Sequence, residues 1–162
     1  MNKNTLVRLS AVAALMAFST FSASSSEDSH AGYYYPEPQT KEVYASPLDP
    51  LPTANKRTRI GFTVGLDTQQ RKRPHAPDFH VFAKGAEAEK MIIVATTEGK
   101  YDTLYRLRAL LAAMTAEART SPLFQNSEQP ENLNFLDLAR LTGFTRVTIT
   151  NGNKLAHRIN IR

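Results

Sequence analysis

The dipeptide Asn151-Gly152 stands between two segments in which apolar and polar residues alternate. Asn-Gly favours the tight turns, with positive φ, that join antiparallel strands. In the flanking segments, residues 144–150 and 154–161, apolar side chains fall on every second position, as in strands with one buried face. This part of the chain therefore predicts an antiparallel hairpin, which needs a second layer to cover its apolar side.

Other segments supply the remaining elements of that layered structure. Residues 59–66 alternate between apolar and polar side chains, which predicts a half-buried strand. Residues 78–84 and the apolar run 91–95 predict two more strands, and residues 103–119 have the apolar spacing of a helix with Asp102 as its N-cap. The apolar positions of this helix are Leu104, Leu107, Leu111, Met114 and Ala118.

A second, short helix is predicted between Asn134 and Gly143. Asn134 and Asp137 have the spacing of a capping box, and glycine is the preferred residue just after a helix. The predicted order is β-β-β-α-α-β-β, an α+β fold with about five strands in a largely antiparallel sheet covered by helices.

The first 25 residues have the pattern of a secretory signal peptide. Lys3 and Arg8 precede an apolar stretch at residues 9–21, and small residues follow it. This stretch is shorter than the roughly 20 residues that a membrane-spanning helix needs. We therefore expect a cleaved leader, a periplasmic protein and no transmembrane segment in the mature chain. The sequence contains no cysteine, which excludes a lipoprotein anchor and suits a periplasm in which disulfides are optional.

Residues 26–55 and residues 56–162 differ in composition and in charge. The first segment has five prolines, five Asp/Glu and one Lys, for a net charge of −4, whereas the second has 17 Lys/Arg and 10 Asp/Glu, for a net charge of +7. Acidic, proline-rich segments with few aliphatic residues are typical of extended, partly disordered chain. We expect an acidic tail at 26–55 and a basic α+β domain at 56–162.

Three consecutive tyrosines, Tyr33, Tyr34 and Tyr35, precede Pro36 in the acidic tail. Tyrosine combines a large apolar ring with a polar tip, and the prolines favour an extended backbone. Two interpretations remain open at this point. The tyrosines either pin the tail to its own domain or dock on another protein.

The residues Arg71, Lys72 and Arg73 form the most compact basic group of the domain. Together with the tyrosines they are the candidate partner-binding residues, for an envelope protein or an anionic surface. Because the leader predicts export, nucleic acid is not an expected partner.

His75, Asp78 and His80 lie within six positions and are weak candidates for a metal site or a hydrolase site. The neighbouring basic group opposes a bound cation, so we expect no metal, no cofactor and no catalytic residue here. The sequence has no Gly-x-Ser-x-Gly motif, no Walker loop and no dinucleotide-binding motif. His157 falls on the apolar face of the last predicted strand, where a hydrogen-bonded core histidine is expected.

Most of the chain resembles a family of short exported alphaproteobacterial proteins. The resemblance lies in HAGYYYPEPQTKEVY (30–44), RIGF (59–62), FAKGAEAEKMIIVA (82–95), YDTLYRLRALLAAMTAEART (101–120) and FLDLARLTGF (135–144). Such proteins often carry the label "molybdopterin-guanine dinucleotide biosynthesis protein A", which implies a nucleotidyltransferase. An enzyme of that kind would be cytoplasmic, larger and equipped with a glycine-rich nucleotide loop, so no catalytic residue is transferred from it.

Three classes of function follow, in order of preference. The first is a small, non-catalytic accessory or binding protein of the bacterial envelope. The second is a periplasmic hydrolase or metal-dependent enzyme that uses His75, Asp78 and His80. The third is the nucleotidyltransferase that the family label implies.

Overall fold

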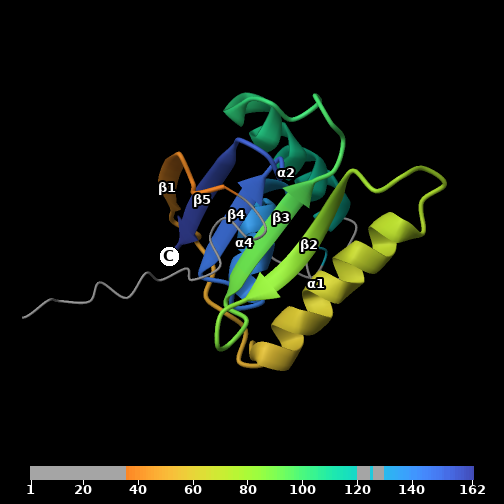
Figure 1. The fold of residues 1–162 in the computed structure, drawn as a ribbon. Helices are drawn as coiled ribbons and strands as arrows, with labels where there is room; N and C mark the ends of the chain where they lie inside the picture. Colours follow the sequence, from red (N-terminus) through yellow and green to blue (C-terminus); the bar gives the residue numbers. More distant parts are fainter. Residues whose placement is uncertain (1–35, 120–124, 126–129) are drawn as a thin grey trace, which may run out of the picture.

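A computed structural model describes residues 36–119, 125 and 130–162 of the chain. It has an α+β fold, as predicted, built on one five-stranded sheet in the order β1-β5-β4-β3-β2 (Figure 1). The elements are β1 (Thr40–Tyr44), α1 (Lys56–Arg71), β2 (Phe79–Lys84), β3 (Lys90–Ala95), α2 (Leu104–Ala118), α4 (Phe135–Leu141), β4 (Arg146–Thr150) and β5 (Ala156–Ile161), with a 3-10 turn at Pro130–Asn132 before α4.

The sheet is mixed rather than largely antiparallel. The hairpins β2–β3 and β4–β5 are antiparallel, whereas β3 pairs with β4 and β1 pairs with β5 in parallel. Parallel neighbours require a long crossover between them. The chain makes one such crossover when it leaves β3, runs through α2 and α4, and returns as β4. The predicted C-terminal hairpin is confirmed, and the prediction of a largely antiparallel sheet was wrong.

The strand predicted at residues 59–66 is part of helix α1. Asn55 caps this helix, because its side-chain oxygen accepts a hydrogen bond from the backbone N–H of Thr58 at 3.0 Å. The four apolar residues that suggested alternation separate onto different sides of the helix. Phe62 and Leu66, one turn apart, pack against the core, whereas Ile60 and Val64 are exposed.

The fifth strand comes instead from the acidic segment. Thr40–Tyr44, within the predicted tail 26–55, forms β1 and pairs in parallel with β5 along the sheet edge. Tyr44 and Ser46 donate hydrogen bonds to the buried carboxylate of Asp137 in α4. Burial, followed by the hydrogen bond to Asp137, raises the pKa of the Tyr44 phenol above its ordinary value of 10.0.

The helix ends agree closely with the sequence. The capping box of Asn134 and Asp137 is present at the start of α4, and Gly143 follows the helix with a φ of +88°. Helix α2 is capped by Thr103 and not by Asp102, because the Thr103 side chain accepts from the N–H of Arg106. The β4–β5 hairpin has a loop at residues 151–155, longer than a two-residue turn, that is held by the Asn151 side chain.

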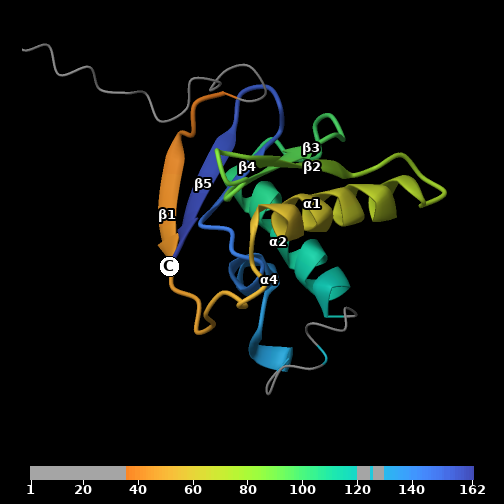
Figure 2. The ribbon, with the colours of Figure 1, turned by 90° about the horizontal axis from the view of Figure 1, so that it is seen from below.

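Helices α1, α2 and α4 pack on one side of the sheet (Figure 2). The main core lies between them and the sheet, where the strand residues Met91, Ile93, Val147, Ile149 and Ile159 are fully buried. Helix α1 runs beside the edge strand β2 (Figure 1). The other side of the sheet has no helix from the described chain.

Among the described residues, no helix has the length and apolarity needed to cross a membrane.

Candidate binding surface

The strand residues on the helix-free side of the sheet define a surface that we call the open face. The register places these residues in rows that run across the strands, because successive side chains of a strand point to opposite sides. The open face comprises Lys41, Val43, His80, Phe82, Lys84, Lys90, Ile92, Val94, Arg146, Thr148, Thr150, Ala156, Arg158 and Asn160.

The open face is strongly basic. Five of its fourteen strand positions are Lys or Arg and none is Asp or Glu. In one row Lys84 lies opposite Lys90, and Lys90 lies opposite Arg146. Like charges directly opposite one another destabilise a sheet. This row thus concentrates three positive residues at neighbouring positions of the sheet.

Apolar side chains lie in the row beside these cations. In the next row Phe82 is opposite Ile92, and Arg158 is opposite Lys41 at the far edge. Phe82 is 42% exposed and Val43 is 56% exposed, although most large apolar residues of the described chain are buried. The open face thus combines positive charge with exposed apolar surface, which is the composition of an interaction site rather than of a solvated sheet.

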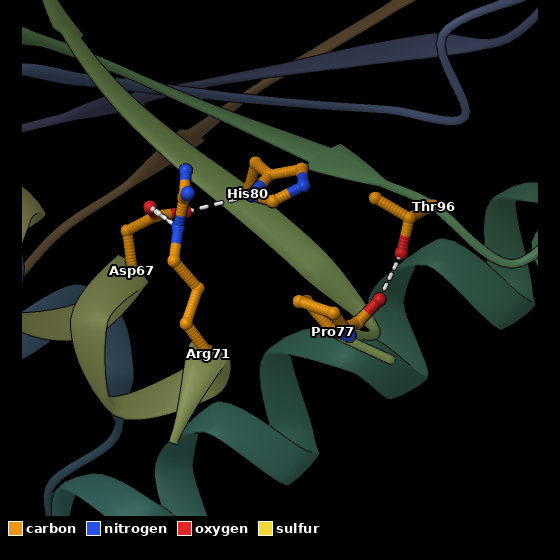
Figure 3. A network of polar contacts seen from close by, with 5 residues as sticks. All are labelled: Asp67, Arg71, Pro77, His80 and Thr96. Atoms are coloured by element: carbon orange, nitrogen blue, oxygen red, sulfur yellow. Dashed lines mark hydrogen bonds and ion pairs between the residues drawn. The ribbon is translucent and has the colours of Figure 1, made fainter. Parts of the chain in front are cut away.

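His80 lies at the rim of the open face, where α1 approaches β2 (Figure 3). Its Nδ1 is 2.7 Å from Asp67 Oδ1, and the other oxygen of Asp67 accepts a hydrogen bond from Arg71 Nε at 2.7 Å. Burial alone would raise the pKa of Asp67, but the hydrogen bonds from His80 and Arg71 outweigh it and lower this pKa below 3.8. Asp67 therefore holds His80 in place and fixes α1 to the sheet edge.

The three predicted metal or hydrolase residues do not come together. Asp78 pairs with Lys100 at 2.9 Å, and this hydrogen bond lowers the pKa of Asp78. His80 binds Asp67, and His75 is exposed in the loop after α1. Thr96 hydrogen-bonds the carbonyl of Pro77 and closes the same loop onto β3 (Figure 3). Within the described part of the chain, no group of three His, Cys, Asp or Glu could hold a metal ion.

The basic group at the end of α1 is spread over separate contacts. Arg71 binds Asp67, and Arg73 forms an ion pair with Glu117 of α2. Lys72 is the C-cap residue of α1 and is exposed. These residues remain predicted partner contacts. Tyr33, Tyr34 and Tyr35, together with the leader 1–25, lie outside the described residues.

His157 is a buried core histidine, as its place in the sequence predicted. It lies on the helix side of β5 and is 2% exposed. Its Nδ1 hydrogen-bonds the hydroxyl of Thr40 at 2.8 Å, and its Nε2 lies 3.3 Å from Glu42 Oε1. Glu42 also accepts from Arg108 of α2 at 2.6 Å. These contacts attach β1 to the domain.

A hollow of about 410 Å³ lies between α2 and α4. Its walls are mostly apolar, with Leu111 and Phe135 among them. Two arginines lie at its rim, where Arg108 binds Glu42 and Arg119 donates to the carbonyl of Glu131. The hollow therefore has fewer cations than the open face, which carries five.

Comparisons with known proteins add nothing to this geometry, because no family model, no curated protein and no solved structure matches the chain significantly. The sequence analysis missed the cations of the open face, although Lys84, Lys90 and Arg146 each occupy an alternate position of a strand whose opposite face is apolar. The alternation can be seen within a single strand. The strand order is needed to show that the cations of five strands lie side by side on one face.

Proposed function

We propose that the protein is a non-catalytic binding protein of the bacterial envelope, exported to the periplasm by its leader, and that its open face binds an acidic segment of another envelope protein. The observation that carries the proposal is the charge of that face. Its strand positions hold five Lys or Arg residues and no acidic residue, with an exposed phenylalanine among them.

An acidic polypeptide fits this surface better than a phosphate-rich one does. Phosphate groups bind mainly through charge, whereas Phe82 and Ile92 form an apolar strip beside the row of Lys84, Lys90 and Arg146. A segment that carries both carboxylates and aromatic rings would satisfy both parts of the face. Nucleic acid is disfavoured because the proposed location is periplasmic.

The test uses a fluorescent random copolymer of glutamate and tyrosine as the probe and measures its polarisation with the full chain. We expect the double variant Lys84→Glu/Lys90→Glu to weaken binding at least tenfold, because it reverses two adjacent charges of one row. The matched control is Lys56→Glu/Arg57→Glu, which makes the same charge change on exposed positions of α1. It should alter binding less than twofold.

Two outcomes would overturn the proposal. If the control variant weakens binding as much as the open-face variant does, the copolymer responds only to the overall basic charge of the chain. If the copolymer fails to bind but vesicles of phosphatidylglycerol bind and lose binding in Lys84→Glu/Lys90→Glu, the open face is a lipid-binding surface.

Raising the salt concentration from 50 to 300 mM should weaken specific binding without abolishing it, since the apolar strip does not depend on charge.

A further inference from the structure

We infer that residues 26–35 of the same chain dock on the open face, so that the protein covers its own binding surface until an acidic partner displaces them. The inference deepens the proposed function, since it assigns an intramolecular competitor to the same surface. Three observations carry it: the charge of the segment, the place where it enters, and the chemistry of its three tyrosines.

The charges of the segment and of the face are complementary. Residues 26–35 contain Glu27 and Asp28 and neither Lys nor Arg, and Glu37 continues the same negative stretch. The open face has only positive residues among its charged strand positions. Attraction between opposite charges is strongest where solvent is partly excluded, as it is over a sheet that has an apolar strip.

The described chain begins at Pro36, beside one end of the open face. The backbone N–H of Gln39 donates to the carbonyl of Ala156 at 3.1 Å, and the Gln39 side chain accepts from the N–H of Ala156 at 2.8 Å. Ala156 stands in the open-face row that continues through Thr150 and Val94 to His80. The preceding residues therefore start next to this row.

Ten residues are long enough to cross the face. Strands lie about 4.8 Å apart, so the four gaps between β1 and β2 span about 19 Å. Ten extended residues reach about 33 Å. The segment is therefore long enough to reach across the open face from β1 to β2.

Tyr33, Tyr34 and Tyr35 match the remaining features of the surface. Their rings can pack on the apolar strip, and the faces of aromatic rings attract Lys and Arg side chains. Pro36 and Pro38 restrict the backbone before it docks, which lowers the entropy lost on ordering. A tether this short also gives an effective concentration on the millimolar scale. A partner must therefore present a better-matched acidic segment in order to displace it.

The chain has no tryptophan, so a single Tyr34→Trp substitution reports on the segment alone. In the full chain we expect acrylamide to quench this tryptophan at least threefold less efficiently than in the same variant carrying Lys41→Glu/Arg158→Glu on the open face. The charge-matched control Lys56→Glu/Arg57→Glu should leave the protection intact. Reversal of the segment's own charge, Glu27→Lys/Asp28→Lys, should remove the protection without touching the domain.

Equal quenching in the Tyr34→Trp protein and in Tyr34→Trp with Glu27→Lys/Asp28→Lys would overturn the inference. Protection that grows with protein concentration would also overturn it, since the segment would then dock on a second copy. The copolymer separates the two proposals. If Tyr33→Ser/Tyr34→Ser/Tyr35→Ser leaves copolymer binding unchanged, the segment does not compete and only the proposed function stands. If the tryptophan is protected but the copolymer never binds, only the intramolecular contact stands.

Discussion

The two faces of the sheet are built from the same five strands and differ in almost every property. The helix-covered face is apolar, and its central residues Met91, Ile93, Val147 and Ile149 are fully buried. The open face carries five cations and an exposed phenylalanine. Because side chains alternate, each strand contributes to both faces, so the residue pattern that fixes the register for folding also aligns the cations.

The difference indicates a division of labour. Burial of apolar surface on the covered face provides most of the stability of the domain, since each fully buried aliphatic side chain contributes about 1.5–3 kcal/mol. On the open face, cations lie opposite one another across the strands, as Lys84, Lys90 and Arg146 do. This concentrated positive charge and the exposed ring of Phe82 support the proposal that the open face serves recognition.

Substitutions on the two sides of β3 would measure the difference directly. Ile93→Ala should lower the free energy of unfolding by about 2–5 kcal/mol, because it leaves a cavity under the helices. Lys90→Ala, three residues earlier and on the opposite face, should change it by less than about 0.5 kcal/mol. Urea denaturation followed by circular dichroism gives both values. A large loss in Lys90→Ala would mean that the open face is part of the folding core.

Much of the fold could be predicted from local patterns. The segments around residues 78–84, 91–95 and 151–152 have strong strand and turn signals, and the structure has strands and hairpins there. The capping box at Asn134 and the position of Gly143 also located α4 correctly. In each of these places the local preference of the backbone agrees with the burial that the fold requires.

Two elements were missed because tertiary contacts outweigh their local pattern. Helix α1 contains Gly61 and Gly65 and reads as an alternating strand, but its Asn55 cap and the packing of Phe62 decide the outcome. Strand β1 has no alternating apolar pattern of its own, and it forms because it pairs in parallel with β5 at the sheet edge. The open face was missed for a related reason: its cations come from five strands whose order is not local information.

Helix α1 repeats the contrast between a buried and an exposed side on a smaller scale. The ring of Phe62 lies 6.4 Å from that of Phe135 and 6.1 Å from that of Phe144, whereas Val64 is 58% exposed. Phe62→Ala should cost about 2–4 kcal/mol of stability. Val64→Ala should cost nothing and stabilise the helix by about 0.5 kcal/mol, because alanine has the higher helix propensity. Thermal melts of both variants test this, and a loss above 1 kcal/mol in Val64→Ala would restore the strand interpretation of residues 59–66.

The smallest expected effect concerns Asp67, which joins α1 to His80 at the rim between the two faces. The pKa of Asp67 is lowered in the folded chain, so the unfolded chain binds a proton at this carboxylate more readily as the pH falls. The stabilising contribution is therefore complete well above pH 3.8 and is lost as the pH falls through the lower folded pKa. Because Arg71 and His80 are partly exposed, we expect a contribution below about 1 kcal/mol.

Asp67→Asn should lower the unfolding free energy at pH 7 by that amount. It should also reduce the decline of the unfolding free energy between pH 5 and pH 3, as measured by urea denaturation across this range. The charge-reduced variant Arg71→Gln should reduce the same decline only in part, because His80 still donates to Asp67. An unchanged acid limb in Asp67→Asn would show that this contact does not hold α1 against the rim of the open face.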